Sequence, residues 1–516
     1  MGYFYNGVLC RQNARQKSRG DAFGADFACF CGQPTSRMHT RKKRLSVGRG
    51  TPALKKERKM EMENQKPSVE NQGIFDARTL GIPKMLLLGL QHMFAMFGAT
   101  ILVPALTGLS VSATLLFAGI GTLMFHLLAK GKVPAFLGSS FAYLAGYWAI
   151  APNGERELLP YACFGVACSA ILYLVLAALI RAFGVTRVMR FFPPIVTGPI
   201  IIAIGLTLSQ SAIDNCSANW LVAIVAVAVV VIFNIWGKGM LKIIPIILGV
   251  AASCIVAVIL QFCGVTVFDA AHLDALRDAA WIGLPFQMQD TVFAVFKDPD
   301  VSLLITAVIT IMPIAIATMM EHIGDICAIG STTGRNYIKD PGLHRTLLGD
   351  GLATMFASLF GAPANTTYGE NTGVLSLTKV YDPRVIRLAA VFAIIFSFSP
   401  KFAALIGLMP TATIGGVSLV LYGMISAVGV RNVVENQVDF TKSRNVIIAA
   451  LILVLSIGIK FSAAGAINFS IGEVQISLSG LAVAAIVGIL LNAILPGKDY
   501  HFDAEEPQDT GVNFEV

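Results

Sequence analysis

The chain has 516 residues, of which 55% are hydrophobic and 14% are charged, and its mean hydropathy is +0.69. This composition excludes a soluble globular protein with a wetted surface and indicates a polytopic membrane protein. The net charge of +8 does not indicate nucleic-acid binding, because residues 1–84 hold 17 Lys and Arg against 7 Asp and Glu, which leaves −2 for the rest of the chain.

Residues 1–84 are predicted to form a disordered basic extension. They contain basic clusters at 41–44 and 55–59, and they lack the apolar run of a secretory signal. Met60 and Met62 precede a polar leader and the first apolar run, so we expect the natural start there and residues 1–59 to be untranslated. The nine cysteines are scattered, and Cys29 and Cys31 lack partners at zinc-ligand spacing, so we expect no metal site and no cofactor.

From Met85 onward, apolar runs recur whose length suits a helix that crosses about 30 Å of hydrocarbon. The pattern predicts an all-α polytopic fold with about fourteen spans, at 85–107, 109–129, 133–151, 158–183, 192–212, 218–236, 241–263, 301–327, 343–362, 364–380, 384–408, 410–429, 443–462 and 478–496.

The distribution of Lys and Arg over the links between spans predicts the orientation. Links on one side carry most of these residues, as cytoplasmic links do, and that side includes both chain ends. The protein is therefore expected to have its N-terminus and its tail, residues 498–516, inside. The other side carries only Arg156, Arg277, Lys297, Lys401 and Lys460.

An outward link at 264–300 divides the predicted spans into two groups of seven. Because seven is odd, a homologous second half must be inverted in the membrane. The fifth spans of the two halves contain matching glycine pairs seven residues apart, Gly198 with Gly205 and Gly416 with Gly423. The sequence therefore predicts a seven-plus-seven inverted repeat.

The third span of each half, 133–150 and 362–380, is short and interrupted by polar and small residues. Broken spans at matching positions point to the binding site of a transporter, and extended backbone at that depth must line a cavity or pair with its counterpart. We expect a strand and a half-helix in each, with helices that start near 138–141 and 369–372. Their positive N-terminal ends would then face one point.

Carboxylates lie in two of the predicted spans. Glu321 and Asp325 are four residues apart on one helical face, after a kink expected at Pro313. Their mutual repulsion favours protonation of at least one, which suits a proton-coupled device. Glu370 lies in the broken tenth span, where a charge must face protein, water or a ligand.

Several polar residues in spans also have an ordinary structural interpretation. A single intramembrane Glu can be a packing residue, and histidines such as His92 often bond a neighbouring backbone. Phe141 taken alone is typical of a core position. Asp350 is expected near the inner mouth without an assigned role, and the sequon at Asn365 is read as accidental because it lies in the membrane core.

Six motifs together resemble the nucleobase–ascorbate transporter family, in its bacterial uracil permease form. They are QHMFAMFGATILVPAL (91–106), KGKVPAFLGSSFAY (130–143), EHIGD (321–325), KDPGLHR (339–345), NTTYGENTGVLSLTK (365–379) and GGVSLVLYG (415–423). The Glu that precedes Asn371 is the uracil-type form of the family signature. The resemblance runs from about residue 87 to about residue 495 and excludes the N-terminal extension.

The resemblance implies a proton symporter for uracil in a bacterial cytoplasmic membrane, working by alternating access and forming a homodimer through its gate domain. It implies a core domain of 85–183 and 301–408 and a gate domain of 184–263 and 409–497. Substrate would be bound by Glu321, Glu370, Gly369, Tyr368, Phe141, Ala99 and Tyr422, and proton coupling would involve Glu321, Asp325 and His92.

One departure leaves the substrate open. Asp325 stands where the best-known uracil permease pattern has a histidine, and an aspartate there is usual in the purine-type branch, so a xanthine or uric-acid symporter is the alternative. An anion carrier of similar fold is less favoured, because acidic residues would face the anion. An enzyme is not expected, since the chain contains no HExxH, GxSxG or phosphate-binding glycine loop.

Overall fold

The computed structural model describes residues 73–268, 270–471, 474–498 and 500. The prediction of disorder is wrong for residues 73–84, which include a 3-10 turn at Ala77–Leu80 and the start of a helix at Ile82. The rest of the predicted extension, with Cys29 and Cys31, and the tail at 501–516 lie outside the described residues.

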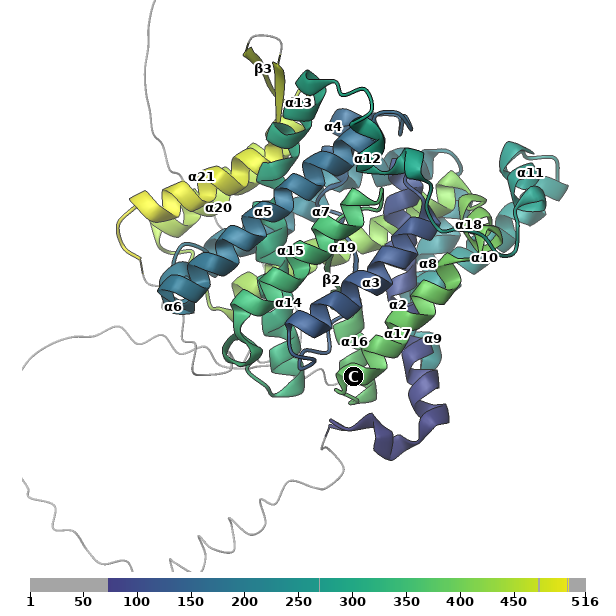
Figure 1. Ribbon diagram of the computed structural model, residues 1–516, viewed down its shortest axis with the longest axis horizontal. Coiled ribbons are helices and arrows are strands. Elements are labelled where there is room, and N and C mark those ends of the chain that lie inside the picture. The colour runs from purple at the N-terminus through teal and green to yellow at the C-terminus, as the bar shows by residue number, and fades with distance from the viewer. Residues whose placement is uncertain (1–72, 269, 472–473, 499, 501–516) are drawn as a thin grey trace, which may run out of the picture. The chain divides into compact units, whose positions relative to one another are not determined.

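The first half of the described chain is helical apart from one short strand (Figure 1). Its elements are a 3-10 turn η2 (Ala77–Leu80), α2 (Ile82–Thr107), α3 (Val111–Leu128), β1 (Leu137–Ser139), α4 (Leu144–Ile150), α5 (Leu159–Phe183), α6 (Val185–Met189), α7 (Pro194–Ser217), α8 (Trp220–Trp236), α9 (Met240–Ile243), α10 (Pro245–Phe262), α11 (Ala270–Asp278), η3 (Met288–Asp290) and α12 (Val292–Val295).

The second half adds a second short strand and a terminal hairpin to its helices (Figure 1). Its elements are α13 (Val301–Ile311), η4 (Met312–Ile314), α14 (Ala315–Thr333), η5 (Ile338–Gly342), α15 (Leu343–Leu359), β2 (Asn365–Thr367), α16 (Gly369–Thr378), α17 (Pro383–Ser397), α18 (Pro400–Gly407), α19 (Thr411–Glu435), α20 (Ser443–Lys460), β3 (Ala466–Ile471), β4 (Val474–Ser479) and α21 (Gly480–Ile494).

The helical membrane character predicted from hydropathy is confirmed. Among the described residues, eight helices are long and apolar enough to cross a membrane, or nine if the bent pair α17 and α18 forms one span. Two shorter apolar helices, α8 and α21, accompany them. The count of fourteen spans and their inverted arrangement remain predictions.

Two stretches differ in shape from a simple span. The run at 384–408 turns by 88° between α17 and α18, because Pro400 begins a new helix that the Ser399 side chain caps. The run from 301 continues to Thr333, and Pro313 lies in the 3-10 turn η4 that interrupts it, as expected. The stretch at 264–300, predicted to be an outward link, contains α11, η3 and α12.

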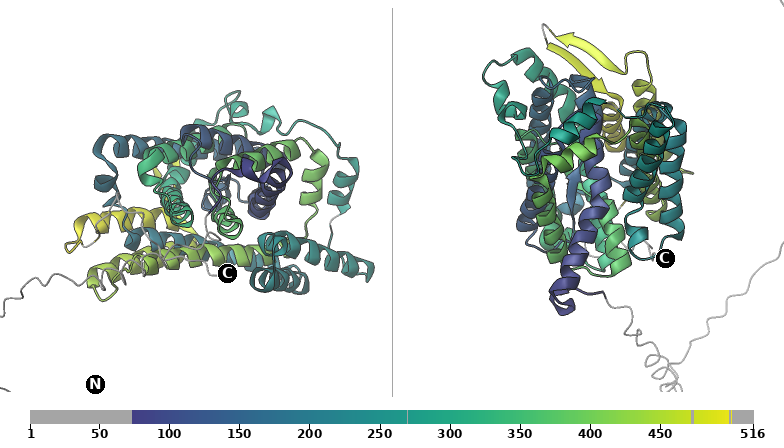
Figure 2. Two further views of the ribbon diagram at one scale, coloured as in Figure 1. Left: turned by 90° about the horizontal axis from the view of Figure 1, so that it is seen from below. Right: turned by 90° about the vertical axis from the view of Figure 1, so that its right-hand side faces the viewer.

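The helices pack in two groups. In the first, α5 and α3 lie along α15, and α17 contacts α3 and α2. In the second, α7 packs along α19, α8 contacts α10 and α19, and α20 contacts α7 and α21. The left view of Figure 2 shows the second group as a layer beneath the first. Because α14 contacts α5 and α15 as well as α7 and α21, the helix with Glu321 lies at the boundary between the groups.

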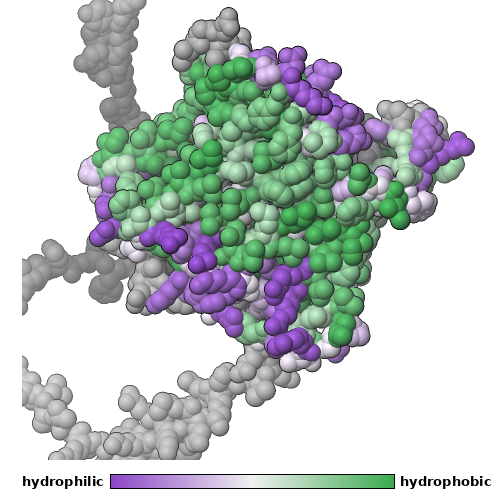
Figure 3. Space-filling view, viewed as in Figure 1, coloured by the Kyte–Doolittle hydropathy of each residue, from purple (hydrophilic) through white to green (hydrophobic). Residues whose placement is uncertain are grey.

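The outer surface is apolar where lipid would contact it. Figure 3 shows a broad hydrophobic band on one face, with polar residues gathered toward two of its edges. On α5, for example, Ile171, Val175 and Leu179 are exposed at four-residue spacing, which places them on one side of the helix. An apolar surface of this extent suits hydrocarbon rather than water.

Candidate functional site

The two short strands pair with each other inside the protein. β1 and β2 are antiparallel, with Gly138 opposite Thr366, and the ladder continues through Ser140 N–H to Ala364 O at 2.8 Å and Tyr368 N–H to Phe136 O at 3.0 Å. All six strand residues are buried. The pairing satisfies backbone groups that neither lipid nor a helix could satisfy.

Side chains from two helices complete this ladder. The Thr122 hydroxyl of α3 accepts from Leu137 N–H at 2.9 Å, and the Thr354 hydroxyl of α15 donates to Asn365 O at 2.7 Å. The Asn365 amide donates to Phe117 O at 3.0 Å, so the sequon asparagine is buried and bonded inside the protein. Helix α16 starts at Gly369 as expected, whereas α4 starts at Leu144, a few residues later than 138–141.

The Tyr368 side chain ties the paired strands to α2. Its hydroxyl donates to Ser139 O at 2.9 Å and lies 3.1 Å from Ser139 Oγ and 3.3 Å from Thr100 Oγ1. The ring passes so close to Gly138 that a Cβ there would lie 2.5 Å from Tyr368 Cε2. Position 138 therefore requires glycine, and Tyr368 holds the start of α16 against β1.

A Gly138→Ala variant should destabilise the protein. Forcing an extra methyl against a buried ring costs about 1–3 kcal/mol. We expect the apparent melting temperature in detergent to fall by several degrees. Gly458→Ala is the control, because apart from the adjoining backbone of α20 no described atom lies within 4 Å of a Cβ at that position. Equal melting temperatures for the two variants would contradict the tight contact at Gly138.

A cavity of about 340 Å³ opens beside the start of α16. Its walls come from β1 and β2, α14 and α16, and from α7 and α19 of the second packing group. Six of the predicted site residues line it: Phe141, Glu321, Asp325, Tyr368, Gly369 and Glu370. Elements far apart in the sequence thus bring the two glutamates to one cavity.

The other three predicted residues lie outside the described lining. Ala99 is fully buried in α2, and its carbonyl oxygen lies 3.4 Å from Ser139 Oγ. The Tyr422 ring of α19 packs edge-on against Phe141, with centroids 5.8 Å apart. His92 of α2 is fully buried, and its Nδ1 and carbonyl oxygen lie 3.2 and 3.1 Å from Asn371 Nδ2. Each of them supports a residue next to the cavity.

Four carboxylates line the cavity, and they differ in their surroundings. Glu435 of α19 pairs with Arg431 at 2.6 Å. Asp325 Oδ2 accepts a hydrogen bond from the Thr367 hydroxyl at 2.8 Å. Glu321 Oε2 is buried and finds no hydrogen-bond partner among the described residues. Glu321 is close enough to Asp325 and Glu370 to interact with both electrostatically. A buried, unbonded carboxylate oxygen that faces other acids favours a ligand that donates hydrogen bonds.

Sequence reasoning missed a buried polar chain behind these acids. Thr367 Oγ1 lies 3.5 Å from His322 Nδ1, and His322 Nδ1 lies 3.3 Å from Asp350 Oδ2. His322 and Asp350 are fully buried. The available signal was helical geometry, since His322 follows Glu321 and must point to a different face, here toward α15.

Two threonines of the cavity were also missed. Thr366 and Thr372 line the cavity and are buried, and neither hydroxyl has a hydrogen-bond partner among the described residues. Each hydroxyl can donate or accept, so both add polar contacts for a ligand. Their place in the interrupted span was the available signal. Across the described ranges between 73 and 500, no three His, Cys, Asp or Glu side chains are grouped to hold a metal ion.

Known sequences match most of the chain. The sequence model of the permease family matches residues 83–465. The chain is 41% identical over 434 residues to the uracil permease of Bacillus caldolyticus, covering 82% of this chain and 94% of that protein. It is 35% identical over 440 residues to the uracil permease of Escherichia coli (strain K12), covering 82% of this chain and 95% of that protein.

Solved structures with a similar fold include two transporters. One is the transmembrane domain of a cyanobacterium bicarbonate transporter, BicA, with a TM-score of 0.52 at 12% identity over 82% of this chain and 99% of that chain. The other is SLC26A9, with a TM-score of 0.55 at 13% identity over 88% of this chain and 72% of that chain. At such identities the similarity concerns the fold alone.

Proposed function

The chain belongs to the permease family of nucleobase–ascorbate transporters, and we propose on this basis that it carries uracil across a bacterial cytoplasmic membrane together with protons, by alternating access. The family predicted from the six motifs is confirmed. The two relatives described above are uracil permeases, which supports uracil as the substrate.

The observation that carries the proposal is the meeting of Glu321 and Glu370 with the first turn of α16 at one cavity. Uracil presents N–H donors beside carbonyl acceptors. The carboxylates accept from the N–H groups, and amide groups at the start of a helix donate to carbonyl oxygens. The first turn of α16 has no side-chain cap among the described residues, and Gly369 is exposed toward the cavity that it lines.

Other predicted site residues are assigned supporting roles. The Phe141 ring packs on the flat pyrimidine. Tyr422, from the gate side, packs against the Phe141 ring and holds it in place. Tyr368 donates to the Ser139 carbonyl oxygen, and the Ala99 carbonyl oxygen accepts from the Ser139 hydroxyl, so both hold β1 in place. These contacts shape the pocket, while the polar edge of the base is read by the two glutamates.

Proton coupling is assigned to Glu321 and Asp325, with His92 supporting Asn371 next to Glu370. The Thr367 hydroxyl donates to Asp325 and lies near His322, which in turn contacts Asp350. Protonation of Asp325 would replace the charge-assisted hydrogen bond from this hydroxyl with a weaker neutral one. Proton binding in the cavity would then change the surroundings of the buried His322–Asp350 pair.

For the architecture, we propose fourteen spans in an inverted repeat with both chain ends inside. The core domain comprises 85–183 and 301–408, and the gate domain comprises 184–263 and 409–497, through which two copies form a homodimer. The two packing groups support this division, since α2, α3, α5, α15 and α17 fall in the first and α7, α8, α10 and α19 to α21 in the second.

Uptake into proteoliposomes tests the substrate. We expect labelled uracil to accumulate when an inward proton gradient is imposed, and to equilibrate without accumulation when the gradient is absent. Unlabelled uracil should compete far better than xanthine or hypoxanthine. Stronger competition by xanthine would favour the purine alternative raised by Asp325, and no uptake of any base would overturn the proposal.

An anion carrier is the second alternative, because the bicarbonate transporter and SLC26A9 share the fold. The cavity argues against it, since Glu321, Asp325 and Glu370 would repel an anion, and Arg431, which also lines the cavity, is paired with Glu435 at 2.6 Å. Uptake of labelled bicarbonate in the same liposomes separates the two functions.

A further inference from the structure

A segment just before α2 lies against the end of α16. Ile74 forms a parallel bridge with Val380, in which Ile74 N–H donates to Lys379 O at 2.7 Å and Tyr381 N–H donates to Ile74 O at 2.8 Å. The residues that pair are about three hundred positions apart in the chain. This segment precedes residue 83, where the match to the family begins.

A buried hydrogen bond strengthens this attachment. Ala77 N–H donates to Asp382 Oδ2 at 2.7 Å, and both residues are buried. Asp382 also caps α17, because its Oδ1 accepts from Arg384 N–H at 2.9 Å. A buried aspartate that bonds two backbone amides from different segments fixes their separation, and losing it would leave Ala77 N–H unpaired.

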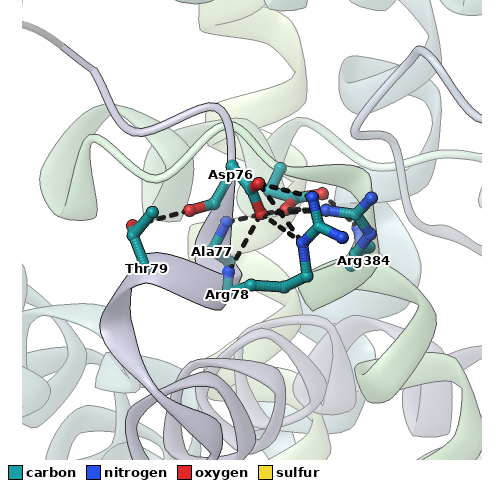
Figure 4. A network of polar contacts seen from close by, with 6 residues as sticks. Asp76, Ala77, Arg78, Thr79 and Arg384 are labelled. Atoms are coloured by element: carbon teal, nitrogen blue, oxygen red, sulfur yellow. Dashed lines mark hydrogen bonds and ion pairs between the residues drawn. The ribbon is translucent and has the colours of Figure 1, made fainter.

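An ion network surrounds that bond, as Figure 4 shows. Arg384 Nη1 lies 3.0 Å from Asp76 Oδ1 and 3.2 Å from Asp382 Oδ2, and Arg78 Nη2 lies 2.6 Å from Asp76 Oδ2. Asp76 and Arg384 are each 42% exposed, so their ion pair adds less than the buried bond.

Phe75 links the same segment to a second helix. The Arg335 guanidinium, two residues beyond the end of α14, lies 3.9 Å from the Phe75 ring centroid. Phe75 also contacts the ring of Tyr381, a residue that follows α16, with ring centroids 5.4 Å apart. One aromatic side chain therefore contacts residues that follow both α14 and α16.

These two helices carry three of the four carboxylates that line the cavity. Glu321 and Asp325 are on α14 and Glu370 is on α16, and Thr332 of the last turn of α14 also lines the cavity. We propose that residues 73–81, which we name the N-terminal clasp, set the spacing between α14 and α16 and thereby position the substrate carboxylates. Phe75, Asp382 and Arg384 are then positioning residues, and their transport effect rests on the proposed function.

The clasp is expected to act independently of pH in the range where transport is measured. Hydrogen bonds from the Arg78 guanidinium lower the pKa of Asp76 to about 2. Because the pKa is lowered, the contribution of Asp76 to the stability of the clasp is complete at a pH above 3.8, the ordinary pKa of an aspartate. That contribution is lost only as the pH falls toward 2. The charged groups that contact Asp76 are Arg78 and Arg384, and Asp382 shares the Arg384 guanidinium with it. Clasp variants should therefore leave the pH profile of uptake unchanged.

The test uses the full chain in lipid nanodiscs with the double variant Phe75→Leu and Arg384→Gln. We expect amide hydrogen exchange across 369–378 to quicken about tenfold, because the end of α16 loses its connection through Phe75 to the segment that follows α14. In liposomes, the KM for uracil should rise about fivefold while the maximal rate changes less than about twofold. Arg384→Lys with native Phe75 should restore most of the protection, because a lysine can still meet both carboxylates.

Arg156→Gln is the matched control, since it removes the same charge from another exposed ion pair, with Asp290 at 2.6 Å. It should leave exchange across 369–378 unchanged. Unchanged exchange in the folded double variant would overturn the clasp. If the wild type took up no uracil, the proposed function would fail, but the hydrogen-exchange measurement would still test whether the clasp holds α16. Failure of the clasp proposal and failure of the proposed function can therefore be told apart. Should the double variant not fold, Phe75→Leu alone is measured in the same way.

Discussion

Glu370→Gln is expected to abolish uracil binding, with a loss of affinity of about 100-fold or more. The carboxylate has two acceptor oxygens and a charge, whereas the glutamine amide presents an N–H₂ donor toward the N–H donors of uracil. A charge-assisted hydrogen bond contributes about 1.5–3 kcal/mol, which corresponds to a loss of about 10- to 100-fold, and the apposed donors add to it. Equilibrium binding of labelled uracil to protein in nanodiscs measures the change.

Glu155→Gln serves as the matched control for this substitution. It makes the same chemical change in the link between α4 and α5, where Glu155 accepts hydrogen bonds from Asn153. Its affinity for uracil should equal that of the wild type. Near-normal affinity in Glu370→Gln would remove Glu370 from the site and leave Glu321 as the acidic ligand.

Asp325→Asn is expected to lower proton-driven accumulation about tenfold or more while changing affinity less than about threefold. Asparagine keeps an oxygen that can accept from the Thr367 hydroxyl, which now lies 2.8 Å from Oδ2, so the local geometry survives. The variant cannot take up a proton there. Accumulation under a proton gradient, compared with exchange of labelled for unlabelled uracil without a gradient, separates coupling from binding.

Asp300→Asn provides the comparison for the coupling measurement. Asp300 caps α13, with Oδ1 accepting from Leu303 N–H at 2.9 Å, and asparagine is an equally good cap. It should retain full accumulation. Equal loss of accumulation and exchange in Asp325→Asn would assign Asp325 to binding and would return the purine-type alternative to the foreground.

Much of the candidate site was accessible from local signals. A carboxylate in an apolar run stands out because hydrocarbon excludes charge, and this singled out Glu321, Asp325 and Glu370. Glycine and polar residues that interrupt the third spans indicated extended backbone, and paired strands lie there, at β1 and β2. These inferences needed only composition and periodicity within a short window.

Other features depend on contacts between distant segments. Thr100 and Ser139 surround the Tyr368 hydroxyl, Asp350 meets His322, and Asp382 binds Ala77 N–H. The residues next to a buried aspartate in the sequence do not indicate which distant group it will bond. The expected single span at 384–408 also bends by 88°. Proline was visible in that sequence, but the angle depends on how α18 packs.

Hydropathy therefore established the membrane class and the apolar helices, because transfer of a residue into lipid depends on that residue and its immediate neighbours. The motifs established the family. Only the tertiary structure decided that α7 and α19 complete the cavity and that Ala99 and Tyr422 lie behind its lining. It also decided that residues before the first span pair with the backbone at the end of α16. The physical reason is that side-chain direction and long-range pairing are set by packing, which no local window of sequence contains.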